Sequence, residues 1–288
     1  MYLSDEQLKE LCNIAKKAAS LAGDYISQNK GTQIEVQSKV GGENIASCVV
    51  TEIDLKAQEI IIKTLEPTLK KYDLGLLAEE SLDNNSRFEK DYFWCIDPLD
   101  GTLCFSKGED GYSTSIALIK KDGTPMIGVV YNPRADSLYH AVLGLGAFKD
   151  ESPLKVNTKN ENLTLLFDQS YLKYPEYAKQ VKELKIKLKE IGLKELNIHP
   201  LGGAVMNGIS TIEMAPAFYY KFPKKTDGGG SLWDFAASSI IQSEAGGFNS
   251  DYYLNPLDLN RKETTFMNHK GVIYCSSKDL LGLIPKVD

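Results

Sequence analysis

The sequence predicts a mixed α/β protein whose first half is of the α+β type and whose second half is of the α/β type. Two amphipathic helical patterns and five strand-length apolar runs occupy the first 150 residues. Beyond them, segments typical of strands and helices alternate to the end of the chain. A change of this kind separates classes of layered fold. We therefore expect two parts, residues 1–155 and 156–288, with a soft boundary near residue 155.

The first part is expected to open with two helices. Ser4 and Gln7 have the spacing of a capping box, and apolar residues then recur at helical spacing until Gly31. A second helical pattern covers residues 54–70. Strands separated by Gly, Asp, Asn and Pro clusters are predicted to follow, at residues 74–78, 93–96, 113–119, 126–131 and 137–141. The last three predict an antiparallel meander with a turn at residues 121–124.

The second part is expected to alternate strands with helices. A strand is predicted at residues 163–167, a lysine-rich helix at 175–191 and an apolar helix at 232–244. A final strand at residues 271–276 and a short helix close the chain. No repeat, long linker or low-complexity segment interrupts this order.

Composition and charge argue against several kinds of partner. The chain has 33 Lys and Arg residues against 39 Asp and Glu residues, which gives a formal net charge of −6. A nucleic-acid polymer or an anionic membrane needs clustered cations, so neither is an expected partner. The N-terminal residues lack the features of a secretory signal, and no apolar run approaches the roughly 18 residues of a membrane span. We expect a cytoplasmic protein whose notable partner is a metal ion.

Carboxylates are the expected ligands for that metal. The five cysteines form no CxxC pair, and their apolar neighbours indicate buried thiols. The three histidines lie far apart in the sequence. Neither residue type therefore predicts a metal site, so we expect the oxygen atoms of Asp and Glu side chains to bind the metal.

The most informative segment covers residues 94–102. A strand is expected to deliver Asp97 at its end, Pro98 prevents that strand from continuing, and Asp100-Gly101 turns the chain. Two carboxylates then lie close together, an arrangement that suits Mg²⁺. The N–H groups that follow would face a phosphate if a helix begins there. An acidic surface turn is the alternative interpretation of this segment alone.

Two further acidic sites change the balance between these interpretations. Glu79 and Glu80 follow the strand predicted at residues 74–78, and Asp234 lies in the first turn of the helix predicted at 232–244. Taken alone, the first site is equally typical of a solvated strand end, and the second of an acid favoured by the helix dipole. The set as a whole is more informative than any one member.

This set resembles the signatures of the inositol monophosphatase superfamily. The segments that carry the resemblance cover nearly the whole chain and lie at residues 51–54, 79–80, 94–102, 128–133, 233–234 and 244–247. That superfamily comprises metal-dependent, lithium-sensitive phosphatases, including inositol monophosphatases, 3′(2′),5′-bisphosphate nucleotidases and fructose-1,6-bisphosphatases. The resemblance implies a layered α-β-α-β-α sandwich with the active site between the two halves.

The resemblance also implies ligands for two Mg²⁺ ions. The first would be held by Glu79, Asp97 and the carbonyl group of Leu99, and the second by Asp97, Asp100 and Asp234. Glu79 would also hold a weaker third ion. The first half of the chain would thus carry most of the metal ligands, and the second half would supply Asp234.

The implied reaction is hydrolysis of a small phosphomonoester by metal-activated water. Thr102, together with Glu79, would orient and deprotonate the water, and Asp54 would support the site from the second helix. The backbone at Gly101 and Thr102 would contact the phosphate. Two divalent ions can activate the water and neutralise the leaving alkoxide.

Two departures from the family pattern bear on the substrate, and both lie in the second half. Gly202, Gly203 and Ala204 are similar to a Gly-Ser/Thr-Ala segment that touches the organic part of the substrate in relatives, but Gly203 lacks the hydroxyl group. Inositol monophosphatases carry an acidic residue after paired tyrosines, where this chain has Lys221. Lysine can pair with a second phosphate, which favours 3′-phosphoadenosine 5′-phosphate over inositol monophosphate. Residues 103–105 match neither subfamily, so both substrate classes stay open.

Three alternatives stand beside this interpretation. A haloacid-dehalogenase-type phosphatase would have one residue, rather than two, between its paired acids. A catalytically idle module that binds a metal or a phosphorylated metabolite would share the same fold. The third alternative is fructose-1,6-bisphosphatase-type activity. Relatives of the inositol type form dimers and several nucleotidases are monomers, so a homodimer is one of two open assemblies.

Overall fold

A computed structural model of the chain describes residues 2–30, 37–38, 49–50, 52–157 and 159–286. The larger of its sheets has seven strands in the order β3-β4-β5-β6-β7-β8-β9. β3 and β4 run parallel, and the remaining neighbours run antiparallel. The strands are β3 (Gly75–Ala78), β4 (Tyr92–Asp100), β5 (Ser113–Lys120), β6 (Pro125–Asn132), β7 (Ser137–Val142), β8 (Gly146–Lys149) and β9 (Ser152–Leu154).

A second sheet has five strands in the order β11-β10-β12-β14-β13. β10 runs parallel to both β11 and β12, and β14 runs antiparallel to β12 and β13. The strands are β10 (Leu163–Asp168), β11 (Leu196–Leu201), β12 (Ala217–Lys221), β13 (Phe248–Ser250) and β14 (Val272–Cys275). The short strands β1 (Gln37–Ser38) and β2 (Val49–Val50) pair with each other.

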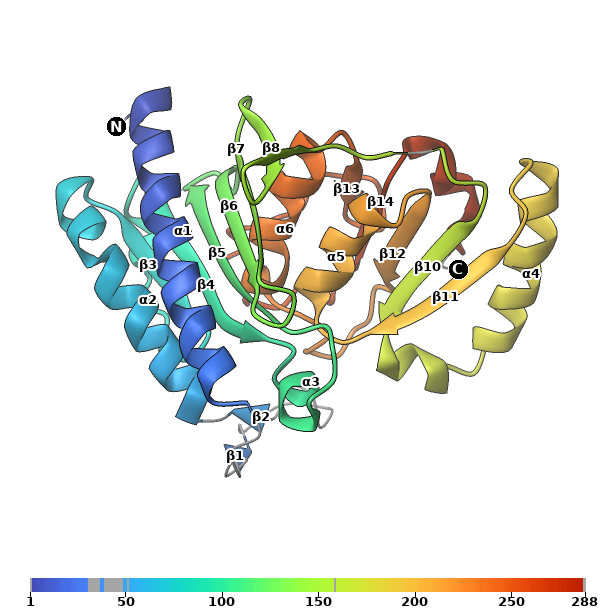
Figure 1. Cartoon of the computed structure of the whole chain (residues 1–288), viewed down its shortest axis with the longest axis horizontal. Coiled ribbons are helices and arrows are strands. Elements are labelled where there is room, and N and C mark those ends of the chain that lie inside the picture. Colours follow the sequence, from blue (N-terminus) through green and yellow to red (C-terminus); the bar gives the residue numbers. More distant parts are fainter. Residues whose placement is uncertain (1, 31–36, 39–48, 51, 158, 287–288) are drawn as a thin grey trace.

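The helices form three layers that alternate with the two sheets (Figure 1). α1 and α2 cover the outer face of the seven-stranded sheet, α5 and α6 lie between the sheets, and α4 covers the outer face of the five-stranded sheet. The predicted α-β-α-β-α sandwich is therefore confirmed. The helices are α1 (Asp5–Gln28), α2 (Glu52–Lys71), α3 (Thr102–Lys107), α4 (Tyr177–Glu190), α5 (Ala204–Glu213) and α6 (Leu232–Glu244), with 3-10 turns η2 (Ser86–Phe88), η3 (Gln169–Lys173) and η4 (Lys278–Leu283).

Side-chain alternation along the strands separates three hydrophobic cores. Successive residues of a strand point to opposite faces of its sheet. In β4, Phe93 packs in the middle core with α5 and α6, whereas Trp94 packs in the core under α1 and α2. In β12, Tyr219 lies in the middle core and Tyr220 in the core beneath α4. Both sheets are thus covered on both faces.

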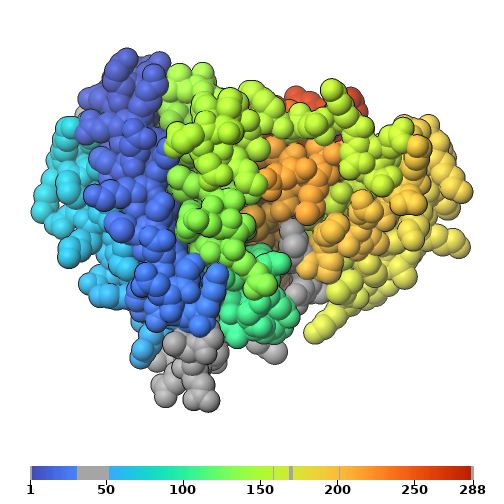
Figure 2. All heavy atoms as spheres, in the orientation of Figure 1, coloured from blue at the N-terminus to red at the C-terminus, as the bar shows by residue number. Residues whose placement is uncertain are grey.

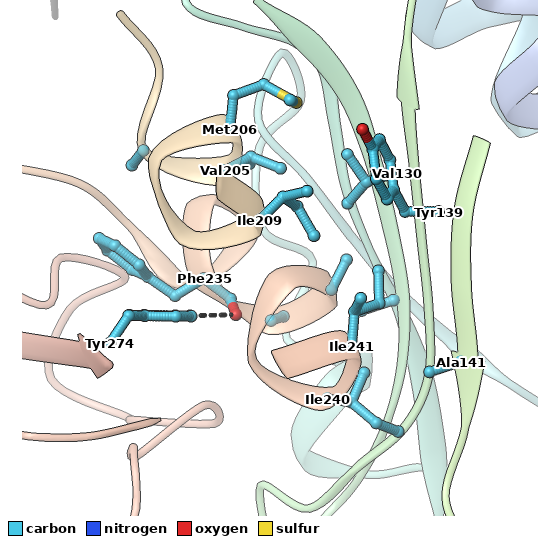
Figure 3. Close-up of a cluster of buried hydrophobic side chains, with 14 of the residues drawn as sticks. Val130, Tyr139, Ala141, Val205, Met206, Ile209, Phe235, Ile240, Ile241 and Tyr274 are labelled. Atoms are coloured by element: carbon cyan, nitrogen blue, oxygen red, sulfur yellow. Dashed lines mark hydrogen bonds between the residues drawn. The ribbon is translucent and has the colours of Figure 1, made fainter. Parts of the chain in front are cut away.

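The middle core joins the two halves of the chain. Side chains of α5 and α6 point toward Val130, Tyr139 and Ala141 of the first sheet, and the Tyr274 hydroxyl donates to the Phe235 carbonyl oxygen at 2.9 Å (Figure 3). In the space-filling view, the orange atoms of the α5 region lie between the green atoms of the first sheet and the yellow atoms of the second (Figure 2). The boundary predicted near residue 155 falls between β9 and β10, and a division of the chain into two parts there stays a prediction.

Most of the predicted elements are present. Ser4 Oγ accepts from the Gln7 N–H at 3.3 Å, and the Gln7 side chain accepts from the Ser4 N–H at 2.9 Å, so the capping box of α1 forms. α2, the β5–β6–β7 meander, β10, α4, α6, β14 and the closing turn η4 lie within a few residues of their predicted ranges. The sequence did not predict β1, β2, β8, β9, β11, β12 and β13. For β1, β2, β8, β9 and β13, which have two to four residues, too few positions are available for alternation to be visible.

One boundary prediction is wrong. Pro98 does not end the strand, since β4 continues through it to Asp100. The pairing of β4 with β5 changes register between Asp97 and Asp100, so the proline lies in an irregular stretch of the ladder. Such a stretch tolerates a residue that lacks an N–H donor. The Pro98 carbonyl oxygen is still paired, because it accepts from the Thr114 hydroxyl at 2.9 Å.

The sequence also predicts buried cysteines and no membrane-spanning segment. Among the described cysteines, Cys12, Cys95, Cys104 and Cys275 are buried free thiols, as predicted. Cys48 and the landmark residue Thr51 lie outside the described residues. Within the described ranges, no helix is both long and apolar enough to cross a bilayer.

We predict that Gly128→Ala destabilises the protein by about 1–3 kcal/mol, the usual cost of overpacking a core. A Cβ atom at Gly128 would lie 2.4 Å from the Ala237 carbonyl oxygen and 2.5 Å from Ile240 Cγ2, so α6 would have to move away from β6. Chemical denaturation measures the loss. Gly282→Ala is the matched control, because a Cβ atom there meets nothing within 4 Å. Equal stability of both variants would contradict the close contact.

Candidate active site and metal centre

Three carboxylates from two distant parts of the chain meet between the sheets. Asp97 and Asp100 lie on β4, and Asp234 lies in the first turn of α6. Each offers one oxygen atom, and these atoms lie within 4.8 Å of one another. Asp97 is 1% exposed and Asp100 is 7% exposed. α6 is fixed near β5 by the Ser115 hydroxyl, which donates to the Trp233 carbonyl oxygen at 3.1 Å.

Backbone N–H groups orient all three carboxylates. Asp97 accepts from the N–H of Leu99 at 2.9 Å. Asp100 accepts from the first N–H groups of α5, those of Ala204 at 3.2 Å and Val205 at 2.9 Å. Asp234 accepts from the N–H of Ser231 at 2.6 Å as part of the capping box of α6. Asp100 therefore acts as a cap for a helix from the other half of the chain.

Burial and mutual repulsion raise the pKa values of the three carboxyl groups. Burial and the negative charge of Glu79 raise the pKa of Asp97 well above its ordinary value. Burial and the charge of Asp234 do the same for Asp100. Burial and the charge of Glu79 raise the pKa of Asp234 to about 6. A divalent cation offsets such repulsion, and an all-oxygen ligand set suits Mg²⁺. The donor set therefore fits the predicted metal.

Glu79 lies beside this cluster without being one of its three members. It follows β3, its N–H donates to the Ile96 carbonyl oxygen at 3.1 Å, and its side chain is half-buried. Its charge acts on Asp97 and Asp234, which places it within electrostatic range of both. The arrangement agrees with the position expected for Glu79, and its role as a ligand stays a prediction.

The residues predicted to handle the water also lie together. The Thr102 hydroxyl, at the start of α3, is 3.0 Å from Asp54 Oδ1 and 3.0 Å from the Leu99 carbonyl oxygen. Asp54 is 1% exposed and lies in the first turn of α2. Gly101 is the N-terminal cap residue of α3. The structure thus brings these four predicted residues to one end of β4.

The predicted substrate segment lies at the start of α5. Gly203 is the N-terminal cap residue of α5, and its N–H donates to the Gly111 carbonyl oxygen at 2.7 Å. A Cβ atom on Gly203 would lie 2.0 Å from Asp100 Oδ2. With Asp100 in this position, a hydroxyl-bearing residue does not fit there. Gly202 and Ala204 flank it, and their contact with a substrate stays a prediction.

Lys221 is engaged by a carboxylate that the sequence did not reveal. Its ammonium group lies 2.8 Å from Asp168 Oδ2, at the end of β10. Asp168 Oδ1 also accepts from Asn207 Nδ2 at 3.1 Å and from the Tyr219 hydroxyl at 3.0 Å. Burial lowers the pKa of Lys221, but the charges of Asp168 and Asp234 outweigh this effect and the pKa is raised. The only sequence signal for Asp168 was its place directly after a predicted strand.

An acidic centre between two sheets, whose carboxylates cap α5 and α6, defines a candidate metal centre in a protein of the layered α-β-α-β-α class. The family model described as "Inositol monophosphatase family" matches residues 7–284. This chain belongs to the inositol monophosphatase family.

Individual relatives agree with that assignment. The chain is 31% identical over 267 residues to an inositol-1-monophosphatase of Synechocystis sp., covering 93% of this chain and 88% of the relative. It is 29% identical over 250 residues to the Nus factor SuhB of Escherichia coli, covering 84% and 85%. The IMPase of Thermotoga maritima superposes with a TM-score of 0.70 at 22% identity over 94% of this chain and 95% of that one, which shows a shared fold.

We predict that Asp97→Asn removes phosphatase turnover and Mg²⁺ binding while raising the stability of the metal-free protein. The substitution deletes one of the charges that repel each other in the cluster. In the wild type, Mg²⁺ at a hundredfold excess over its Kd should stabilise the fold by about 2.7 kcal/mol. Thermal unfolding with and without Mg²⁺ measures both effects. Asp258→Asn, at an exposed position, is the control and should leave the Mg²⁺ response intact.

We predict a pH dependence of opposite sign for the metal-free and Mg²⁺-bound states. The folded-state pKa of Asp234 is about 6 against an ordinary value of 3.8, so the native state keeps a proton that the unfolded chain releases. Stability without Mg²⁺ should therefore fall as the pH rises from about 4 to about 6. Protons compete with Mg²⁺, so Mg²⁺ affinity should fall as the pH drops below about 6. Unfolding curves and calorimetry across this window test both signs, and a flat profile would refute them.

Proposed function

We propose that this protein is a Mg²⁺-dependent phosphatase that hydrolyses a small phosphomonoester with a metal-activated water. The observation that carries the proposal is the meeting of the buried carboxylates Asp97 and Asp100 with the half-buried Asp234, beside the hydrogen-bonded pair Thr102–Asp54. Family membership and the inositol-1-monophosphatase relative support it.

Five groups would hold the metal. Asp97, Asp100 and Asp234 would bind two Mg²⁺ ions together with Glu79 and the Leu99 carbonyl group, and Glu79 would bind a weaker third. When bound, the ions would lower the pKa of a water and neutralise charge on the phosphoryl group and the leaving oxygen. The raised pKa values of the carboxyl groups reflect their burial and the repulsion between these ligands when no metal is bound.

Thr102 would hold the nucleophilic water and pass on its proton. A hydroxyl group has one proton to donate and lone pairs to accept with. Thr102 Oγ1 donates its single proton to Asp54 Oδ1 or to the Leu99 carbonyl oxygen, and the hydroxyl oxygen can also accept a hydrogen bond from a water. Asp54 would then take up the proton that Thr102 relays, and Glu79 would orient the water from the end of β3. The N–H groups at Gly101 and Thr102 would contact the phosphate.

Two substrate classes are candidates. The Synechocystis relative and the family support inositol monophosphates. The lysines at positions 221, 224 and 225 support a bisphosphorylated nucleotide such as 3′-phosphoadenosine 5′-phosphate. Gly202, Gly203 and Ala204 would contact the organic part of either one. The expected partner is therefore a small phosphorylated metabolite, and the expected cytoplasmic location and the choice between monomer and dimer stay predictions.

A binding role without catalysis is the second candidate. A curated relative at 29% identity is named a Nus factor, which is a different kind of role from phosphatase activity. The hydrogen-bonded pair Thr102–Asp54 beside the three carboxylates supports the enzyme, because metal binding alone does not need this pair. Phosphate release separates the two proposals.

We predict Mg²⁺-dependent phosphate release that Li⁺ inhibits. The wild type should be assayed on inositol 1-phosphate, 3′-phosphoadenosine 5′-phosphate and fructose 1,6-bisphosphate, each with and without Mg²⁺ and Li⁺. Thr102→Ala should lower kcat by about 10²–10⁴-fold, the usual contribution of a general base, while Thr102→Ser retains most of it. Tight Mg²⁺ binding with no release from any substrate would overturn the phosphatase proposal and favour the binding role.

A further inference from the structure

We propose that Asp168 and Lys221 together form the specificity element of this site, and that Asp168 accepts a hydrogen bond from a hydroxyl group of an uncharged polyol attached to a single phosphate. The inference rests on the proposed phosphatase function and names its substrate class. It assigns a role to Asp168, whose carboxylate supplies the acceptor that Lys221 cannot.

The sheet register brings the two side chains to one face. β10 and β12 are parallel neighbours, and Leu166 pairs with Tyr219. Both of these residues face the middle core. Asp168 and Lys221 each follow two residues later, so they lie on the same inner face at the carboxyl ends of the two strands. That edge of a parallel sheet is where open α/β proteins commonly bind ligands.

α5 connects Asp168 to the metal ligands. The N–H groups of Ala204 and Val205 bind Asp100, and the side chain of Asn207, in the same first turn of α5, binds Asp168. The two carboxylates are therefore held by one helical turn. A substrate whose phosphate is bound by the Mg²⁺ that Asp100 would hold would present its organic part toward Asp168.

The charges of the pair determine which organic groups fit. The 2.8 Å ion pair is neutral, and Asp168 is further fixed by Asn207 and Tyr219. A second phosphate would have to draw Lys221 away and would then face the unpaired Asp168 carboxylate. A hydroxyl group can donate to Asp168 without breaking the ion pair. The side chains are 17% exposed for Lys221 and 26% exposed for Asp168, so a substrate can reach them.

Asp168→Asn tests this assignment, because it removes the charge and keeps the shape. We expect kcat/KM for inositol 1-phosphate to fall about tenfold, chiefly through KM, since a charge-assisted hydrogen bond becomes a neutral one. The value for 3′-phosphoadenosine 5′-phosphate should rise, because Lys221 is released from its partner. The ratio of the two values is the readout, since a merely structural defect lowers both together. Asp258→Asn, at an exposed position, is the matched control and should leave the ratio unchanged.

An unchanged ratio would overturn the inference, whether both values stay the same or both fall equally. Binding of inositol 1-phosphate by calorimetry with Mg²⁺, in a Thr102→Ala background with and without Asp168→Asn, needs no turnover. It therefore tests Asp168 even where the wild type releases no phosphate and the proposed function itself fails. Weaker binding after the second substitution supports the role of Asp168, and equal binding refutes it.

Discussion

The contact of α6 with the first sheet determines where the chemistry of this protein takes place. α6 approaches β6 at Gly128 closely enough to exclude even a methyl group. Because α6 packs here, Asp234 lies close to the carboxylates of β4, although the negative charges repel one another. The apolar side chains of the middle core offset that repulsion, and they come from both halves of the chain. The clustered carboxylates favour metal binding but lower the stability of the metal-free fold, and the apolar packing around them offsets this loss.

Asp100 shows how the same atoms serve structure and site. Its carboxylate caps α5 through the N–H groups of Ala204 and Val205 while it faces the other two acids. A group held by two backbone donors has little freedom to rotate, so the ligand is pre-organised before a metal arrives. The orientation of α5, and with it the hydrogen bond from Asn207 to Asp168, is coupled to the metal centre.

The sequence predicted those parts of the site that have strong local signals. Short segments predict the turn at Asp100-Gly101 and the helix start before Asp234. The structure brings Asp54, Glu79, Asp97 and Thr102 to the same region. Asp168 was missed, because its importance depends on the pairing of β10 with β12 and no local motif marks it. Lys221 was identified, but its partner was not. The continuation of β4 through Pro98 was also missed, since it depends on an irregular register with β5.

The space taken by Asp100 has a consequence for engineering and for sequence divergence. Position 203 has no room for a side chain while Asp100 Oδ2 occupies the point 2.0 Å from its Cβ position. Grafting the Ser- or Thr-containing segment of inositol monophosphatases into this chain would therefore displace a carboxylate of the acidic centre rather than simply add a hydroxyl group. A side chain at position 203 would therefore require the Asp100 side chain to shift, so a change of substrate preference at this position is coupled to the geometry of the metal centre.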